Sequence, residues 1–299
     1  MIQTHLGEFS ALLTAIFWVI SGVFFEKASK RTSSLAVAYL RMIFAFILIS
    51  LLLWVTRGKP LPTDATPSAW LWLSLSGLVG FVIGDIFLFE AYVRIGARVS
   101  LLLMSFSPVI TGVLSYFIFG ETLQPLAILG IVLTLAGIAV VVLTRGEHKN
   151  LKLRHEPYGV FCGVMGAIGQ SVGTILSKQG IGNYDAFAAT QVRIIASIIG
   201  FTVFFIIGKH WQKLAILVKD TYSSLMTAAG AVFGTILGVG FSLLAIQHTQ
   251  AAVAAAIMSI MPVLVIPVNW VILKERIKWV EIFGALITVS GVILLYLKP

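Results

Sequence analysis

Three charged side chains, Arg41, Asp85 and Arg193, fall inside long apolar stretches of the sequence. A charge at the depth of a helix centre costs about 2.5–3.5 kcal/mol on membrane-insertion scales, so such a residue usually faces a partner or a water-filled cavity. Counted from the same end of two consecutive stretches, Arg41 and Asp85 are both about seven residues deep, or roughly 10 Å at 1.5 Å per residue. Their equal depth makes an ion pair between them geometrically possible.

An ion pair between Arg41 and Asp85 could have either of two roles. In the first, the pair is structural and fixes the packing of two neighbouring helices. In the second, Asp85 binds and releases a proton or engages a cationic group of a substrate, while Arg41 tunes the pKa of its carboxyl group. Both residues are therefore candidates for a substrate or coupling site.

Four further polar or amphipathic side chains also lie inside apolar stretches: Gln191, Gln170, Trp18 and Asn269. Gln191 is a close neighbour of Arg193. Gln170 and Trp18 occupy equivalent positions of the two halves of the chain, so they are candidates to face each other across a central cavity. The intramembrane arginines have an alternative, since a long cationic side chain can extend to the lipid headgroups.

The composition indicates which elements must position these side chains. The chain has 299 residues, of which 59% are hydrophobic and 11% charged, and its mean hydropathy is +1.01. A soluble domain averages about 25% charged residues, and a transmembrane helix needs roughly 20 apolar residues. The sequence therefore predicts an all-α polytopic membrane protein with ten transmembrane helices, near 7–26, 34–56, 69–92, 97–119, 124–144, 157–178, 186–207, 224–246, 251–273 and 277–297.

Residues 91–143 and 245–297 carry the same apolar pattern at a constant shift of 154 residues. Matching positions include Ala91/Ala245, Met104/Met258, Pro108/Pro262, Glu121/Glu275, Gly130/Gly284 and Gly137/Gly291. The first two spans of each half align more weakly, at a shift of 152. Five spans per repeat is an odd number, so the second repeat must enter the membrane in the opposite orientation. Inverted apolar repeats of this kind are typical of transporters, whose substrate site lies between the halves.

The polar segment 145–156 separates the two halves. It predicts a first repeat over 1–144, a linker loop over 145–156 and a second repeat over 157–299. Asp85 aligns with Val239 at the 154-residue shift, so the acid is present in one repeat only. Scaffold residues tend to keep the symmetry of a duplication, and this exception favours a functional role for Asp85.

Prolines and glycines mark expected bends and close contacts. Pro108 and Pro262 occupy matching positions inside predicted spans, where each removes a helical hydrogen bond and favours a kink. Such paired kinks are either gating points or static bends that aid packing. Glycines spaced four residues apart let helix backbones approach closely where lipid supplies no hydrophobic drive, and they mark the packed faces of the third and eighth spans: Gly80, Gly84, Gly234 and Gly238.

The net charge of +9 is distributed unevenly over the loops. When the loops between predicted spans are numbered from the N-terminus, 15 of the 21 basic residues fall in the odd-numbered loops. Loops rich in lysine and arginine usually lie in the cytoplasm, so this asymmetry places the odd-numbered loops there and both termini outside. Nucleic-acid binding requires a clustered basic face, whereas these charges are scattered over five loops, so no nucleic-acid partner is expected. Lys178 closes the sixth span and is expected to extend to the headgroups of the bilayer.

Enzyme and metal signatures are missing from the sequence. It contains no HExxH, no P-loop, no GxSxG and no histidine pair at ligand spacing. The lone Cys162 lies in an apolar span, so neither a disulfide framework nor a thiolate metal site is expected. We expect no enzymatic activity, no metal and no cofactor.

Residues 99–143 and 255–297 resemble the repeat of the EamA-like, ten-span members of the drug/metabolite transporter superfamily. The resemblance rests on Pro108, on the Gly120-Glu121-Thr122 segment before an apolar Gly-rich span, and on the position of Arg41 in the second span. It covers essentially the whole chain. It implies a secondary transporter of small metabolites, often an exporter of amino acids or related compounds, in a bacterial inner membrane. It also implies cytoplasmic termini, in conflict with the charge distribution.

These observations predict a transporter that moves a small-molecule substrate by alternating access, with protons as a candidate coupling ion through Asp85. The alternative is a non-transporting membrane scaffold or assembly partner. Such a protein is expected to carry long extramembrane loops or an appended domain, and this sequence shows neither. Ten spans suffice for a cavity within a monomer, and a dimer is equally compatible with the sequence.

Overall fold

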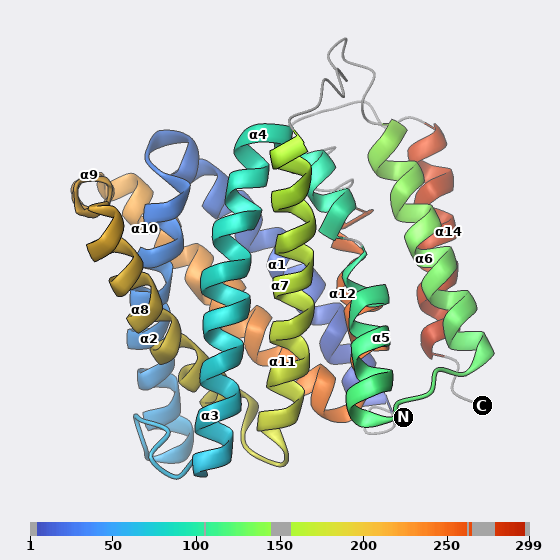
Figure 1. Ribbon diagram of the computed structural model, residues 1–299, viewed down its shortest axis with the longest axis horizontal. Helices are drawn as coiled ribbons and strands as arrows, with labels where there is room; N and C mark the ends of the chain where they lie inside the picture. The colour runs from blue at the N-terminus through green and yellow to red at the C-terminus, as the bar shows by residue number, and fades with distance from the viewer. Residues whose placement is uncertain (1–4, 105, 145–156, 262, 265–278, 297–299) are drawn as a thin grey trace.

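A computed structural model describes residues 5–104, 106–144, 157–261, 263–264 and 279–296. Over these residues the chain is helical and contains no β-strand. The helices stand side by side as a bundle (Figure 1). In chain order they are α1 (Leu6–Arg31), α2 (Ser34–Arg57), α3 (Pro67–Ser76), η2 (Gly77–Gly84), α4 (Asp85–Met104), α5 (Ser107–Phe119), α6 (Pro125–Thr144), α7 (Pro157–Ile181), α8 (Ala186–Gly208), α9 (Trp211–Lys219), α10 (Thr221–Gly230), η3 (Ala231–Gly238), α11 (Val239–His248), α12 (Ala251–Met258) and α14 (Trp279–Tyr296).

Six segments of the described chain are long and apolar enough to cross a membrane: Leu6–Ser29, Ser34–Arg57, Pro67–Leu88, Pro157–Ile181, Ala186–Gly208 and Thr221–His248. Shorter apolar helices occupy parts of three other predicted spans, at Ser107–Phe119, Pro125–Val140 and Ile282–Leu294. Much of the predicted span 251–273 lies outside the described residues. The chain is thus an all-helical, multi-pass membrane protein, and helix length supports six of the ten predicted spans.

The predicted connection between the third and fourth spans falls inside α4, which is helical throughout. Leu88 of α4 lies against Gly166 of α7, and Ile95 lies against Gly159, so this part of α4 runs toward the start of α7. Leu103, eight residues further along α4, lies against Gly163, which is back between those two glycines. A straight helix would carry Leu103 about 12 Å beyond Ile95 in the same direction. The helical backbone therefore bends back within α4, near the predicted connection, and the predicted fourth span is interrupted at a different place, between Met104 and Ser107.

The duplication is visible in the helices as well as in the sequence. The two π-helical segments, η2 and η3, end at Gly84 and Gly238, which are related by the 154-residue shift. The starts of α3 and α10, at Pro67 and Thr221, obey the same shift. π-Helices are rare and often occur at functional sites. Their repetition at equivalent positions identifies them as a property of the repeated unit, which the sequence pattern did not predict.

The two repeats interlock. Helix α1 of the first repeat packs against α10, η3 and α11 of the second, and α7 of the second repeat packs against α3, η2 and α4 of the first. Helices α6 and α14 pack against each other at one edge of the bundle (Figure 1). Because each repeat inserts its first helix into the other, the interface between repeats lies in the middle of the protein.

Glycines make this interlocking possible. A Cβ atom at Gly169 of α7 would lie 2.8 Å from the Cα atom of Gly84, and one at Gly173 would lie 2.9 Å from the Cα atom of Gly80. In the second repeat, Cβ atoms at the predicted contact glycines would meet side chains of α1 at 2.6–2.7 Å, namely Ser21 at Gly234 and Trp18 at Gly238. The structure therefore places all four predicted glycines at contacts between the repeats.

We expect Gly169→Ala to destabilise the protein by about 1–3 kcal/mol, because the added methyl group overpacks the contact with η2. Gly22→Ala is the matched control, since nothing lies within 4 Å of a Cβ atom at that position of α1. The control should be neutral or slightly stabilising, because alanine has the higher helix propensity. Thermal unfolding in detergent compares the two variants, and equal unfolding temperatures would contradict the assigned contact.

The sequence had predicted Pro108 in the middle of a helical span, and the structure shows that this prediction was wrong. Pro108 lies in the first turn of α5, where a residue has no helical partner for its N–H group, so proline costs nothing there. The bend is instead the break between α4 and α5. The second repeat is interrupted at the same place, since α12 ends at Met258, the counterpart of Met104. Pro262 lies outside the described residues, and gating by either proline stays a prediction.

Candidate functional site

A small cavity lies between the two repeats. The first repeat contributes Trp18 of α1 and Phe81 of η2. The second contributes residues of four helices, namely Gln170, Thr174 and Ser177 of α7, Arg193 of α8, Val239, Ser242, Leu243 and Ile246 of α11, and Met258 of α12. The volume of about 20 Å³ suffices for roughly one water molecule. The cavity joins an apolar wall to a few polar groups, which is the usual character of a small-molecule site.

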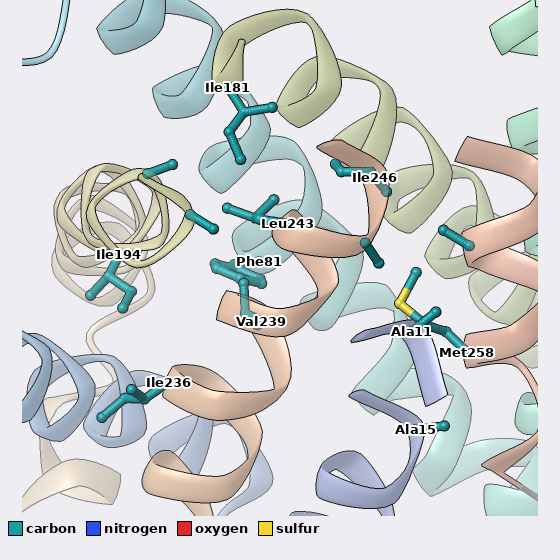
Figure 2. Packing of buried hydrophobic residues seen from close by; sticks show 14 of the residues in the cluster. Ala11, Ala15, Phe81, Ile181, Ile194, Ile236, Val239, Leu243, Ile246 and Met258 are labelled. Carbon is teal, nitrogen blue, oxygen red and sulfur yellow. The ribbon is translucent and has the colours of Figure 1, made fainter. Parts of the chain in front are cut away.

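The apolar wall belongs to the main hydrophobic core. Phe81, Val239 and Leu243 lie next to one another in Figure 2, and all three are less than one-tenth exposed. Val239 follows η3 directly, just as Asp85 follows η2 in the first repeat. Asp85 and Val239 therefore occupy equivalent positions in the structure, although only one of them is charged.

Arg193 brings a positive charge to the wall of this cavity. Its helix, α8, is capped at the N-terminus by Asp185, whose side chain accepts a hydrogen bond of 2.8 Å from the N–H group of Ala188. Arg193 is 4% exposed, and its Cζ atom lies 4.3 Å from the centroid of the Phe81 ring, which is a cation–π distance. Its Nε atom has no hydrogen-bond partner among the described residues. The guanidinium is therefore buried against an aromatic ring at the surface of the cavity.

Arg41 and Asp85 form the ion pair that their depth in the sequence made possible. The pair joins Arg41 Nη2 to Asp85 Oδ2, and both side chains are largely buried, with exposed fractions of 15% and 13%. The Cζ atom of Arg41 also lies 5.5 Å from the centroid of the Phe25 ring on α1. The pair does not line the cavity. Its position is beside the cavity, at the junction of η2 and α4.

The other predicted residues have different positions. Trp18 and Gln170 line the same cavity, as their equivalent places in the repeats had predicted. Gln191 does not line it, because its amide donates hydrogen bonds to Ser50 Oγ at 2.7 Å and to the Pro60 carbonyl at 2.8 Å. Those bonds tie α8 to α2 and to the following loop. Asn269 lies outside the described residues.

A second polar cluster lies at one end of the cavity, where Lys178 directly follows the lining residue Ser177. Lys178 forms an ion pair with Glu121 and donates a 3.0 Å hydrogen bond to the Thr249 carbonyl. Glu121 also accepts a hydrogen bond from Ser115, and Thr249 donates one of 3.0 Å to Glu8. We call Glu8, Ser115, Glu121, Lys178 and Thr249 the end cluster.

The end cluster corrects the expectation that Lys178 extends to the headgroups. Its side chain is 19% exposed and that of Glu121 is 18% exposed, so the pair is largely shielded from solvent. The cluster joins α7 of the second repeat to α1 and to the α5–α6 connection of the first. Besides Lys178, only Glu121 of this cluster gave a sequence signal, through its match with Glu275 in the repeat.

A separate clamp holds the loop that follows α2. Tyr184 donates a 2.7 Å hydrogen bond to Asp64 Oδ1, and Arg57 pairs with the other oxygen at 2.7 Å. The hydrogen bond from Tyr184, together with the nearby charges of Arg57 and Lys59, holds the pKa of Asp64 below its usual value. An acid with a lowered pKa stabilises the fold at neutral pH, and that stabilisation is lost only as the pH falls through the lowered value.

Comparison with known proteins assigns this architecture to a family. Residues 5–143 and 157–297 each match the model of the EamA-like transporter family. Two relatives are described as uncharacterized transporters. YetK of Bacillus subtilis is 22% identical over 300 residues, which cover 100% of this chain and 89% of the relative. A Synechocystis protein, sll0355, is 21% identical over 309 residues, which cover 98% of this chain and 91% of the relative.

The fold of this chain is also similar to that of a protein whose crystal structure is known. The TM-score is 0.75 at 16% identity, and the match covers 96% of this chain and 95% of that one. At this identity the likeness establishes the fold alone. Two matches to one family model within a single chain show that the duplication is a pair of family repeats.

Proposed function

The chain belongs to the EamA-like transporter family, and from this premise we propose that it is a secondary transporter that carries a small metabolite across the cytoplasmic membrane of a bacterium. We further propose that transport proceeds by alternating access between the two repeats, with export as the expected direction. The observation that carries the proposal is the cavity, because residues of both repeats line it. A site at the interface of two repeats changes shape whenever the repeats move against each other.

The dimensions of the cavity support a conformational cycle. Sites for small organic ligands usually enclose about 300–1,000 Å³, whereas this cavity measures about 20 Å³. A metabolite therefore enters only after the repeats have moved apart. The interlocked glycine contacts between α7 and η2 let the helices slide without large side chains in the way. The end cluster joins the repeats by hydrogen bonds and an ion pair, which must break when that end opens.

In this proposal the ion pair beside the cavity links transport to protons. A proton on Asp85 removes its negative charge and weakens its hold on Arg41, which can then change position. Because Asp85 directly follows η2, and η2 carries the lining residue Phe81, such a change acts on the cavity wall. Protonation would then favour one arrangement of the repeats over the other.

The proposed function is tested by a screen that presupposes no particular substrate. Metabolites are profiled in cells and medium with and without the protein, and each compound that differs is offered to proteoliposomes containing the purified protein. Transport predicts protein-dependent flux of at least one compound down its gradient, saturable with concentration. If no compound differs, or if every compound crosses protein-free liposomes equally fast, the proposed function is wrong.

A further inference from the structure

The charges at the wall that Arg193 forms, apart from the end cluster, do not balance. Two guanidinium groups, Arg41 and Arg193, and one carboxylate, Asp85, lie around the cavity wall and beside it. Asp85 is paired with Arg41, and its attraction to Arg193 acts only at longer range. No other carboxylate of the described chain forms an ion pair with Arg193. The surroundings of Arg193 thus hold one positive charge more than the paired carboxylate neutralises, while Glu8 of the end cluster is engaged by Thr249.

The surroundings of Arg193 make this excess charge unfavourable. The residue is 4% exposed, and a buried charge is costly unless it is paired and hydrogen-bonded. The Phe81 ring offsets part of this cost through a cation–π contact, but a ring accepts no conventional hydrogen bonds in the guanidinium plane. The orphan Nε atom shows that the hydrogen-bonding capacity of Arg193 is not used up. An anion brought into the cavity would satisfy both the charge and the donors.

The hydroxyl groups of the cavity wall do not compete for this role, and Gln170 can contribute a neutral amide donor but no charge. The hydroxyl groups of Thr174 and Ser242 donate hydrogen bonds to carbonyls of their own helices, at 2.9 Å and 2.7 Å. Their remaining lone pairs are acceptors and repel an anion. The planar fork of a guanidinium, by contrast, matches a carboxylate in both charge and geometry. Trp18 and Phe81 offer aromatic surface to the rest of the molecule.

We propose that Arg193 is the anion site of this cavity and binds a carboxylate group of the transported metabolite. The proposal rests on the proposed function in that the cavity is taken as the transport site. The ligand class is a small organic carboxylate, which supplies the negative charge that the protein lacks at this position. Arg41 is paired with Asp85 in this structure, whereas Arg193 has no such pair within the described ranges, so the roles of the two arginines are different.

Binding is measured apart from transport, by thermal unfolding of the purified protein in detergent. The probes are a panel of aliphatic, aromatic and amino-acid carboxylates from acetate to benzoate, each compared with its uncharged or esterified analogue. We expect several carboxylates to stabilise the wild type and their neutral analogues to be at least about tenfold weaker, as the loss of a charge-assisted hydrogen bond implies. Arg193→Gln should abolish the difference, and Arg193→Lys should retain part of it.

The matched control is Lys213→Gln, which removes an exposed positive charge on α9, a helix that contributes no residue to the cavity wall. It should bind the carboxylates like the wild type. The proposal is overturned if no carboxylate stabilises the wild type, if neutral analogues bind equally well, or if Arg193→Gln keeps the preference. If carboxylates bind through Arg193 while the metabolite screen finds no transported compound, the proposed function is overturned and Arg193 is still an anion site.

Discussion

Replacing Asp85 with asparagine is expected to reduce pH-driven flux of the substrate to the level of protein-free liposomes, while the protein stays folded in the membrane. Asparagine keeps the size of the side chain but carries no charge and takes up no proton. If protonation of Asp85 releases Arg41 during each cycle, the variant is fixed in one charge state and a pH gradient has no group to act on. The measurement is uptake into proteoliposomes with and without an imposed pH gradient.

The variant has a side effect that needs its own control. Removing one partner of a buried ion pair typically costs about 3–5 kcal/mol, because the other charge is left uncompensated. Asp85→Asn in combination with Arg41→Gln removes both charges and should regain stability without regaining coupling. Flux in the double variant therefore separates loss of coupling from loss of folding. Asp64→Asn is the matched surface control, since it removes a loop carboxylate that also pairs with an arginine.

Two results would contradict a coupling role for Asp85. Unchanged flux of Asp85→Asn across a pH gradient would remove the carboxylate from the mechanism. Full recovery of pH-driven flux in the double variant would assign the pair to helix packing, which is the structural alternative. Loss of pH-driven flux in both, with wild-type behaviour in Asp64→Asn, is the outcome that coupling requires.

The ion pair shows what sequence alone could provide. Depth in a membrane helix follows from counting residues. Equal depths of Arg41 and Asp85 on consecutive spans made an ion pair geometrically possible, and the structure contains it. The repeat worked in the same way for Trp18 and Gln170, because equivalent positions in related halves converge on the interface between them. Helices and their approximate limits were predictable because lipid demands long apolar segments.

Positions that depend on the exact path of the backbone were not predictable. Gln191 is only two residues from Arg193, yet this separation turns it to another side of α8, where it binds the loop after α2. Pro108 was expected to bend a helix, but the chain breaks just before it. The π-helical geometry of η2 and η3 has no signature in hydrophobic periodicity, and it alters which residues face the cavity. Phe81, which lies in η2, and Ser242, which lies shortly after η3, were therefore not predicted to line the cavity.

Lys178 is the clearest case of a non-local effect, and its partner leads to a second prediction. Its position at a helix end suggested contact with lipid headgroups, whereas a glutamate 57 residues earlier in the chain draws it inward. The resulting pair holds the α5–α6 connection against the end of α7. If this pair keeps one end of the cavity closed, its loss should shift the protein toward a state that is open at that end.

We therefore expect Glu121→Gln to increase the rate at which a membrane-impermeant maleimide labels a cysteine placed at Ser242, a residue of the cavity wall. The background is Cys162→Ala, which removes the lone natural thiol. An uncompensated Lys178 destabilises the closed state, and a shift of about 1.4 kcal/mol is enough for a roughly tenfold change in labelling. Glu90→Gln is the matched control, because it breaks an ion pair with Arg94 that is 41% and 35% exposed and does not join the repeats.

The charge-reversed double variant, Glu121→Lys with Lys178→Glu, provides the decisive comparison. It keeps an ion pair between the same two positions. The cysteine at Ser242 should therefore be labelled more slowly than in Glu121→Lys or Lys178→Glu alone, at a rate close to that of the background protein. A single variant that labels no faster than the background would show that other contacts of the end cluster, such as that between Glu8 and Thr249, suffice to keep this end closed. Fast labelling in the double variant as well would mean that the lysine and glutamate act through their separate hydrogen bonds, and the ion pair would then have no part in gating.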